Sequence, residues 1–386
     1  MISRSSRRAE CSPAFFEHPP EGPGRFRMPL FAETALIPLP DDVSLFRPIG
    51  FAAAFLSMAC WVITSIAFTT AGRRYGTTTV NVSRSVIALG LLLAWVWLLS
   101  GEPFPFPPDN RILWLAISGI TGLAIGDQLI FSAFNRIGPR LTLLILTLAP
   151  MMTALIAWPI IREPLTAIGW VGMAVTIAGV LWVISERNDP EPDEDRPRNS
   201  LHNLKLGVTL AMTGVVAVSI GNVLAKLGMM PAPANPESGP VDPLIAQDVR
   251  MIAGAATIVL MAVGAGLLGR RIGTPPEPDP ELRPSRAVAL TAIGIGTVLG
   301  PVLGIFFFLY SAALIEVAIT ATIVALTPVA ILPFNRMIEG THPTRRAILG
   351  ACLGVIGVSI LAFGSAGGGE TAGSPPPAIE SLELAP

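Results

Sequence analysis

The segments LTLLILTLAP (residues 141–150) and ITATIVALTP (residues 319–328) match one another at an offset of 178 residues. The matched positions are Thr142, Ile145, Leu148 and Pro150 in the first segment and Thr320, Ile323, Leu326 and Pro328 in the second. The same offset places Gly122, Gly126, Gly172 and Gly179 on Gly300, Gly304, Gly350 and Gly357. A run of matches at one offset indicates an internal duplication of the chain.

Apolar segments long enough to cross a membrane surround both copies. A spanning helix needs roughly 20 mostly apolar residues. Ten segments satisfy this requirement: 49–70, 79–100, 112–134, 141–161, 166–185, 205–228, 245–268, 286–309, 317–338 and 345–364. The breaks between them are polar or rich in Pro and Gly, as in GEPFPFPPDN and EGTHPTRR.

Five spans in each half is an odd number, so the second half enters the membrane opposite to the first. The sequence therefore predicts an all-α polytopic membrane protein with ten transmembrane helices in two inverted five-helix repeats. This architecture is typical of secondary transporters, which place their site near the middle of the membrane.

The composition agrees with a membrane protein. Of the 386 residues, 51% are hydrophobic and 14% are charged, against about 25% charged residues in soluble domains. The net charge of −1 gives no reason to expect a nucleic-acid partner. The expected parts are a disordered N-terminal tail (1–47), a first repeat (48–185), a charged linker (186–203), a second repeat (204–364) and a disordered C-terminal tail (365–386).

The end of each repeat resembles a known family. AFNRIGPRLTLLILTLAPMMTALIAWPIIREPLTAIGWVGMAVTIAGVLWV (133–183) and YSAALIEVAITATIVALTPVAILPFNRMIEGTHPTRRAILGACLGVIGVSIL (310–361) share a small-residue helix, a proline within a helix, a glutamate in the next loop and a Gly-rich helix. This pattern is similar to the EamA-type domain of the drug/metabolite transporter superfamily. The resemblance implies ten helices, a central cavity and the export or exchange of small metabolites such as amino acids.

Asp127 lies inside the third expected span, beside Gln128. An ionised carboxylate there costs at least about 2.5 kcal/mol, so it should face a partner or a wet cavity. Its counterpart in the second half is Ile305, so the duplicated frame does not require an acid. One interpretation is a carboxylate that couples transport to protons or binds a cation, and the other is a structural ion pair.

Arg84 is the expected partner of Asp127. The second and third spans run antiparallel, which puts both residues in the same half of the membrane. Arg250 corresponds to Arg84 in the second half but has no acidic counterpart to Asp127. A scaffold or snorkelling role for both arginines is therefore the alternative.

Two polar helix faces are candidates for lining a cavity. The first span carries Ser57, Trp61, Thr64 and Phe68 on one face, and the sixth carries Ser219, Asn222 and Lys226. Polar faces in spanning helices can also hold helices together. For Lys226, near the end of its span, snorkelling is the favoured interpretation.

Pro150 and Pro328 each free a backbone carbonyl one turn earlier and can kink their helices. The neighbouring Thr147 and Thr327 either satisfy the freed groups or contact substrate. Glu163 and Glu339, in short loops at the membrane surface, are expected to interact with helix ends.

Enzymatic classes are disfavoured. His18, His202 and His342 all lie outside the expected spans, and no P-loop, metal-ligand pattern or cofactor motif is present. The sequence thus predicts a non-enzymatic secondary transporter of a small polar metabolite, with the lipid bilayer, a small-molecule substrate and protons as candidate partners. A membrane channel or scaffold with structural polar residues is the alternative.

The expected location is the cytoplasmic membrane of a bacterium. The two indications of orientation conflict. The odd-numbered loops carry more Lys and Arg than the even-numbered ones, which would place the N-terminus outside. The family resemblance implies cytoplasmic termini, which is the orientation preferred here.

Overall fold

The computed structural model describes residues 43–75, 77–102, 104–107, 109–184, 201–231, 239–267, 284–330 and 345–366. Regular structure within these residues is helical, with no strand. Most of the predicted tails and linker, and Glu339, lie outside the described residues.

The first half begins with a short turn, η1 (Val43–Leu45). Its helices are α1 (Phe46–Tyr75), α2 (Thr77–Ser100), α3 (Arg111–Ser118), η2 (Gly119–Gly126), α4 (Asp127–Leu146), α5 (Ala149–Ile161) and α6 (Ala167–Ile184). The second half comprises α7 (Leu201–Met229), α8 (Pro243–Leu267), α9 (Arg286–Thr297), η5 (Val298–Gly304), α10 (Ile305–Leu314), α11 (Val317–Val324), α12 (Thr327–Ala330) and α14 (Arg345–Ala366).

Six of the described helical segments are long and apolar enough to cross a membrane, and four shorter apolar segments accompany them. The six are Phe46–Gly72, Thr79–Ser100, Arg111–Ala133, Leu204–Met229, Pro243–Gly264 and Arg286–Leu314. The boundary expected between the third and fourth spans differs: α4 continues through residues 135–140, and the helix is interrupted at Thr147 and Leu148 instead. Pro150, in the first turn of α5, explains why that break lies there.

Each half contains a π-helical segment at the same place in the repeat. η2 ends at Gly126 and η5 ends at Gly304, which correspond at the offset of 178 residues. Both segments are rich in glycine, and η5 also contains Pro301. A π-helical turn widens the helix and is frequently found at functional sites. The two wide turns therefore mark equivalent places in the two halves.

The helix break before each proline is also repeated. α4 ends at Leu146 and α5 begins at Ala149, while α11 ends at Val324 and α12 begins at Thr327. Pro150 and Pro328 follow these breaks directly. The predicted kinks at both prolines are confirmed as interruptions at equivalent positions.

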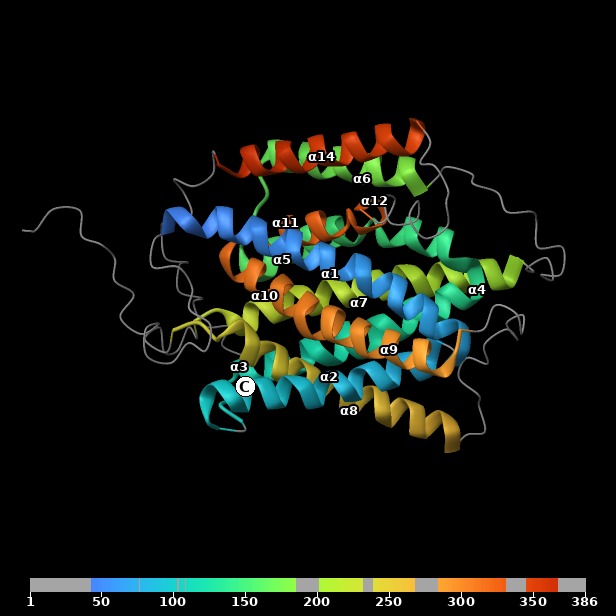
Figure 1. The fold of residues 1–386 in the computed structure, drawn as a ribbon. Helices are drawn as coiled ribbons and strands as arrows, with labels where there is room; N and C mark the ends of the chain where they lie inside the picture. The colour runs from blue at the N-terminus through green and yellow to red at the C-terminus, as the bar shows by residue number, and fades with distance from the viewer. Residues whose placement is uncertain are drawn as a thin grey trace, which may run out of the picture.

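The last helices of the two halves pack on each other through glycines, and Figure 1 shows α6 and α14 side by side. A Cβ on Gly172 would meet the backbone at Gly357, and a Cβ on Gly179 would meet the backbone at Gly350. Gly172 corresponds to Gly350 and Gly179 corresponds to Gly357 in the repeat. The contact between Gly172 and Gly357 is therefore the repeat equivalent of the contact between Gly350 and Gly179. The order of the contacts makes the two helices antiparallel, so a pseudo-twofold axis crosses them.

The two halves also interlock at the centre. α7 of the second half packs on η2 of the first, and α1 of the first half packs on η5 of the second. Gly122 and Gly221 meet so closely that a Cβ on Gly221 would lie 2.7 Å from the Gly122 Cα. Each π-helical segment is therefore pressed against the first helix of the other half.

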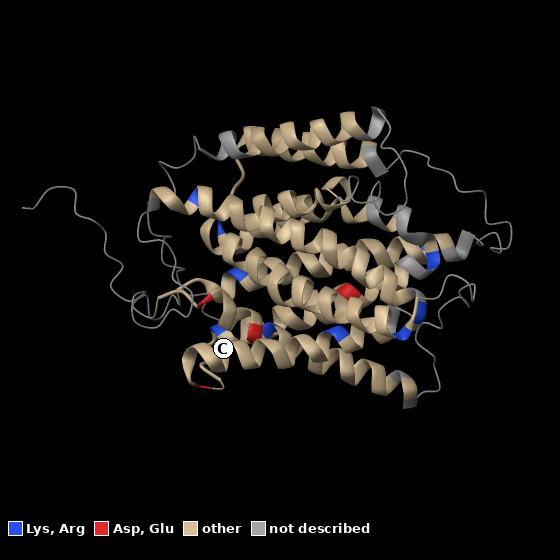
Figure 2. Ribbon diagram, viewed as in Figure 1, with Lys and Arg blue, Asp and Glu red and all other residues tan. Residues whose placement is uncertain are grey.

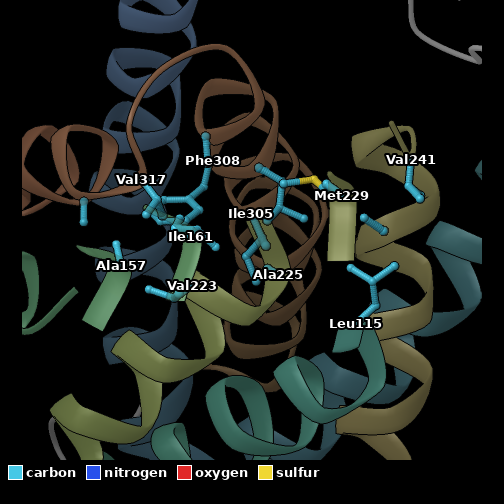
Figure 3. Close-up of a cluster of buried hydrophobic side chains, with 14 of the residues drawn as sticks. Leu115, Ala157, Ile161, Val223, Ala225, Met229, Val241, Ile305, Phe308 and Val317 are labelled. Atoms are coloured by element: carbon cyan, nitrogen blue, oxygen red, sulfur yellow. The ribbon is translucent and has the colours of Figure 1, made fainter. Parts of the chain in front are cut away.

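The largest buried apolar cluster draws on both halves (Figure 3). It combines Leu115 and Ile161 from the first half with Val223, Ile305 and Phe308 from the second. Between membrane-spanning helices such side chains contribute through close van der Waals packing, because lipid is as apolar as they are. The halves thus share one core, which fixes their charged residues relative to each other.

Candidate functional site

Arg84 and Asp127 form an ion pair beside the first π-helical segment. Arg84 lies on α2, and Asp127 is the residue directly after η2. The Arg84 Nη2 atom donates a hydrogen bond to Asp127 Oδ2 at 2.5 Å. The side chain of Arg84 is 7% exposed and that of Asp127 is 27% exposed. The contact expected between these two residues is present.

Further groups hold the Arg84 guanidinium in place. Its Nε donates to Asn81 Oδ1 at 2.9 Å, and the rings of Phe68 and Phe131 lie 5.4 and 5.3 Å from its Cζ. Asn81 Nδ2 in turn donates to Gln128 Oε1 at 3.5 Å. The guanidinium is therefore fixed by a carboxylate, an amide and two aromatic rings.

The second half repeats the amide and the arginine of this arrangement. At the offset of 166 residues that relates Arg84 to Arg250, Asn81 falls on Gln247. Both Gln247 and Arg250 lie on α8, and they are 0% and 2% exposed. Sequence reasoning found the arginine but missed Gln247. The repeated spacing of an amide three residues before an arginine could have revealed it.

Arg250 lacks the partners that Arg84 has. Its Nε and Nη1 atoms are buried and make no hydrogen bond with the described protein. Gln247 Nε2 donates to the Pro301 carbonyl at 3.0 Å, which leaves Gln247 Oε1 buried and without a partner. The position equivalent to Asp127 is Ile305, which packs in the apolar cluster of Figure 3.

Arg250 nevertheless lies close to the first π-helical segment. A Cβ on Gly122 of η2 would lie 3.8 Å from Arg250 Nη2, and the charges of Arg250 and Asp127 interact. Arg84 and Arg250 thus both act on the single carboxylate at the end of η2. The immediate surroundings of this turn carry two guanidinium groups and one carboxylate.

Asp248 is a second buried carboxyl that sequence reasoning missed. It is 0% exposed, and neither carboxyl oxygen has a hydrogen-bond partner among the described residues. It shares a helix face with Leu244 and Met251, which pack in an apolar cluster with Leu92 and other residues. It lies two residues from Arg250, about 200° around the helix, so it points away from that guanidinium.

The polar face of α1 contacts the second π-helical segment. Ser57 Oγ donates to the Gly304 carbonyl at 2.7 Å, and Thr64 Oγ1 donates to the Gly296 carbonyl at 3.4 Å. Both hydroxyls are buried between helices, and Trp61 between them packs on the apolar cluster. In this arrangement the two hydroxyls join helices of different halves.

The polar face of α7 contacts the first half. Ser219 Oγ donates to the Ala149 carbonyl at 3.2 Å, and Asn222 lies between Ser219 and Lys226 on the same face, partly buried. The Lys226 ammonium forms an ion pair with Glu163 and donates to the Ile315 carbonyl at 2.7 Å. Lys226 is therefore held by protein groups, in place of the expected snorkelling.

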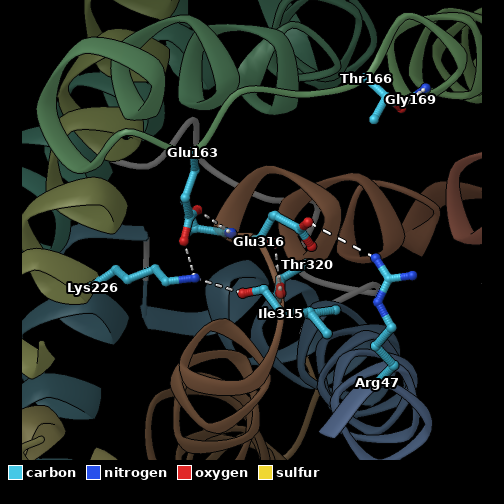
Figure 4. A network of polar contacts seen from close by, with 9 residues as sticks. Arg47, Glu163, Thr166, Gly169, Lys226, Ile315, Glu316 and Thr320 are labelled. Carbon is cyan, nitrogen blue, oxygen red and sulfur yellow. Dashed lines mark hydrogen bonds and ion pairs between the residues drawn. The ribbon is translucent and has the colours of Figure 1, made fainter. Parts of the chain in front are cut away.

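Glu163 joins the two halves at one end of the molecule (Figure 4). Besides Lys226, it accepts a hydrogen bond from the backbone N–H of Val317, the first residue of α11, at 3.2 Å. The neighbouring Glu316 lies 3.9 Å from Arg47 of α1. The helix-end role expected for Glu163 is confirmed, and the helix it caps belongs to the other half.

The proline-associated threonines differ in their contacts. Pro328 has no N–H to donate to the Val324 carbonyl, and Thr327 Oγ1 donates to that carbonyl at 2.6 Å. Thr327 therefore satisfies the group that the proline frees. Thr147, in the first half, is 4% exposed and lies in the break between α4 and α5.

Most described charged residues lie toward the helix ends, and few lie within the helices, as Figure 2 shows. Among the described residues, no group of three or more His, Cys, Asp or Glu side chains could hold a metal ion. What distinguishes the centre is therefore the set of charges beside η2.

Comparison with known proteins gives a consistent result. The model of the EamA-like transporter family matches residues 48–185 and again residues 205–363. None of the curated proteins matches this chain. One solved structure, described only as a crystal structure of a protein, is similar with a TM-score of 0.60 and 18% identity, over 82% of this chain and 98% of that one. At this identity the likeness shows a shared fold.

Proposed function

The chain belongs to the EamA-like transporter family, as a multi-pass membrane protein, and we propose that it is a secondary transporter that moves a small polar metabolite by alternating access. The observation that carries the proposal is that each half contains a π-helical segment and a helix break before a proline, at equivalent positions, and that the two halves interlock. Each π-helical segment lies against the first helix of the other half. Such paired, discontinuous helices are how many transporters build a central site between repeats.

We further propose that ten helices cross the membrane as two inverted five-helix repeats. The six long spans and four shorter apolar segments sum to this number. The antiparallel packing of α6 and α14 about a pseudo-twofold axis supports the inversion. The membrane proposed is the cytoplasmic membrane of a bacterium, with both termini in the cytoplasm.

Asp127 is the proposed coupling residue. It is the carboxylate at the end of η2, it is partly exposed, and it has no counterpart in the second half. A proton that binds Asp127 would weaken its attraction to Arg84 and free the guanidinium. Proton binding and a change in the contacts between α2 and α4 would thus be linked at one pair of side chains.

The other proposed site residues surround this pair or the equivalent turns. Gln128 lies beside Asp127, while Trp61, Thr64 and Asn222 lie on the helices that cross the π-helical segments. Thr147 and Pro150 lie at the first helix break and Thr327 and Pro328 at the second, and these breaks would act as hinges when the halves move. The transported metabolite would be an amino acid or a related polar compound, exported or exchanged.

Counterflow in proteoliposomes tests the transport function. Vesicles loaded with one unlabelled metabolite should accumulate the same labelled compound transiently, and the uptake should saturate. A panel of small polar metabolites that gives no counterflow would contradict the proposal. Non-saturable flux down a gradient would favour the alternative, a channel.

Asp127→Asn tests the coupling. The amide keeps a hydrogen-bonding oxygen for Arg84 but does not titrate, so counterflow should persist while uptake driven by a pH gradient is lost. Asp109→Asn is the matched control, because Asp109 also pairs with an arginine but lies before α3, outside the central site. Gradient-driven uptake at the wild-type rate by Asp127→Asn would end the coupling proposal.

A further inference from the structure

Three of the unsatisfied buried polar atoms of α8 lie on one face of the helix, and those of Asp248 lie on another. Arg250 Nε, Arg250 Nη1 and Gln247 Oε1 are buried without a hydrogen-bond partner in the described protein. The two residues lie three positions apart on α8 and so share one helix face. Unpaired buried charge is among the costliest features that a fold can carry. A ligand that supplies the missing partners would remove that cost.

The first half indicates which groups are missing. There, Arg84 Nε is bound by Asn81 Oδ1, and Arg84 Nη2 is bound by the carboxylate of Asp127. In the second half, the amide nitrogen of Gln247 turns to the Pro301 carbonyl. The position of the carboxylate is occupied by an isoleucine, Ile305. Compared with Arg84, Arg250 therefore lacks a carboxylate beside its guanidinium.

We propose that Arg250 and Gln247 bind the carboxylate end of the transported solute. This inference rests on the transport function proposed above and names the class of its substrate. The Arg250 donors would bind the solute carboxylate, and Gln247 Oε1 would accept a hydrogen bond from a neighbouring hydroxyl or ammonium group. The solute is therefore an α-hydroxy or α-amino carboxylate.

The charges around the site fit this ligand. Arg84 and Arg250 both act on the surroundings of η2, while Asp127 neutralises only one of them. Asp248 points about 200° away from Arg250 and packs among apolar side chains. A ligand with one carboxylate therefore completes the local charge balance, whereas a cationic ligand would add a third positive charge.

A set of related small molecules tests the site. The unfolding midpoint of the purified protein is measured with L-lactate, propionate, lactamide, L-alanine and alaninamide. Lactate and alanine should raise the midpoint most, propionate less, and the two amides should have no effect. Arg250→Gln should raise the half-saturating concentration roughly 30-fold or more. Arg286→Gln, at an exposed arginine at the start of α9, is the control and should bind as the wild type does.

Ile305→Asp gives an independent test. It places a carboxylate at the position equivalent to Asp127, where the repeat predicts that it pairs with Arg250. This variant should fold, and lactate and alanine should no longer raise its midpoint, because its own carboxylate occupies the guanidinium. If Arg250→Gln fails to fold, the binding measured with Ile305→Asp decides whether Arg250 binds the solute carboxylate.

The outcomes separate this inference from the transport function. Wild-type-like binding by Arg250→Gln or by Ile305→Asp would overturn the site, as would equal effects of the acids and the amides. Counterflow of neutral or cationic solutes without binding of carboxylates would overturn the site and leave the transport function standing. Binding with the expected pattern but no counterflow would support the site and overturn the transport function.

Discussion

Arg84 and Arg250 occupy equivalent places in the two halves, yet their surroundings differ. Arg84 is held by Asp127, Asn81 and two aromatic rings, whereas two of the Arg250 nitrogen atoms have no partner in the described protein. The backbone around them is repeated, including the π-helical segments η2 and η5. The duplication thus kept the frame symmetric while the chemistry of the two halves diverged. Because a small solute is itself asymmetric, we expect its site where the side chains of the two halves differ while the backbone is repeated.

Removing each arginine is the strongest test of this difference. Arg84→Met leaves Asp127 without its partner, which should cost roughly 3 kcal/mol or more of the free energy of unfolding. Arg250→Met breaks no bond of the guanidinium nitrogens Nε and Nη1, so its cost should be below about 1 kcal/mol, or the variant should be more stable. The unfolding midpoints of the purified variants measure both effects.

A double variant provides the control for this test. Arg84→Met with Asp127→Leu replaces the whole pair by apolar groups and should recover part of the loss. Equal destabilisation by Arg84→Met and Arg250→Met would mean that the two arginines are held alike, and the proposed difference between the halves would be wrong.

The contact between Lys226 and Glu163 tests whether this ion pair holds the two halves together at one end of the molecule. Glu163→Gln removes the charge that pairs with Lys226 and weakens the cap on α11. The side chain of Lys226 is 12% exposed and that of Glu163 is 19% exposed. The expected cost is about 1–3 kcal/mol. Lys226→Met should cost a similar amount, and the double variant should cost less than the sum. Additive losses would show that the two side chains do not interact.

The sequence alone predicted the features that follow from local pattern. The spans, the duplication and the breaks at Pro150 and Pro328 depend on runs of apolar residues and on proline geometry. The pairing of Arg84 with Asp127 followed from their depths in antiparallel helices. These properties are readable without knowing how the helices pack.

The features that depend on packing could not be predicted in this way. No residue pattern predicted the π-helical turns, because glycine-rich stretches also occur in ordinary α-helices that pack closely. Lys226 was expected to snorkel because it lies near the end of its span. Its contact with Glu163 could not be predicted, because Glu163 belongs to the other half and comes close only when the chain folds. Gln247 and Asp248 gained significance only once their atoms were found buried without partners.

Thr327 gives a smaller effect that tests the repeated helix breaks. Thr327→Val removes the hydroxyl that binds the carbonyl freed by Pro328 and should cost about 1 kcal/mol. With Pro328→Ala, the backbone N–H returns to that carbonyl, so Thr327→Val should then cost much less. The first half has Ala149 at the equivalent position and cannot form this bond. An equal cost of Thr327→Val with and without Pro328 would contradict the assignment.

The smallest expected effect comes from a second Asp–Arg pair, which lies outside the central site. Arg111 Nε donates to Asp109 Oδ1 at 2.8 Å, and this hydrogen bond holds the pKa of Asp109 below its ordinary value of 3.8. Since the pKa is lowered by folding, the pair stabilises the protein above pH 3.8, and the effect disappears as the pH falls through the lowered value. Asp109→Asn should therefore lower the stability at pH 7 by less than about 1 kcal/mol and should match the wild type in acid. Unfolding midpoints at several pH values would measure this difference. The side chains of this pair are exposed to the same extent as those of Arg84 and Asp127, so the expected difference comes from its position at the start of α3, at a helix end. A loss as large as that of Arg84→Met would mean that a pair at a helix end is as strong as the pair beside η2.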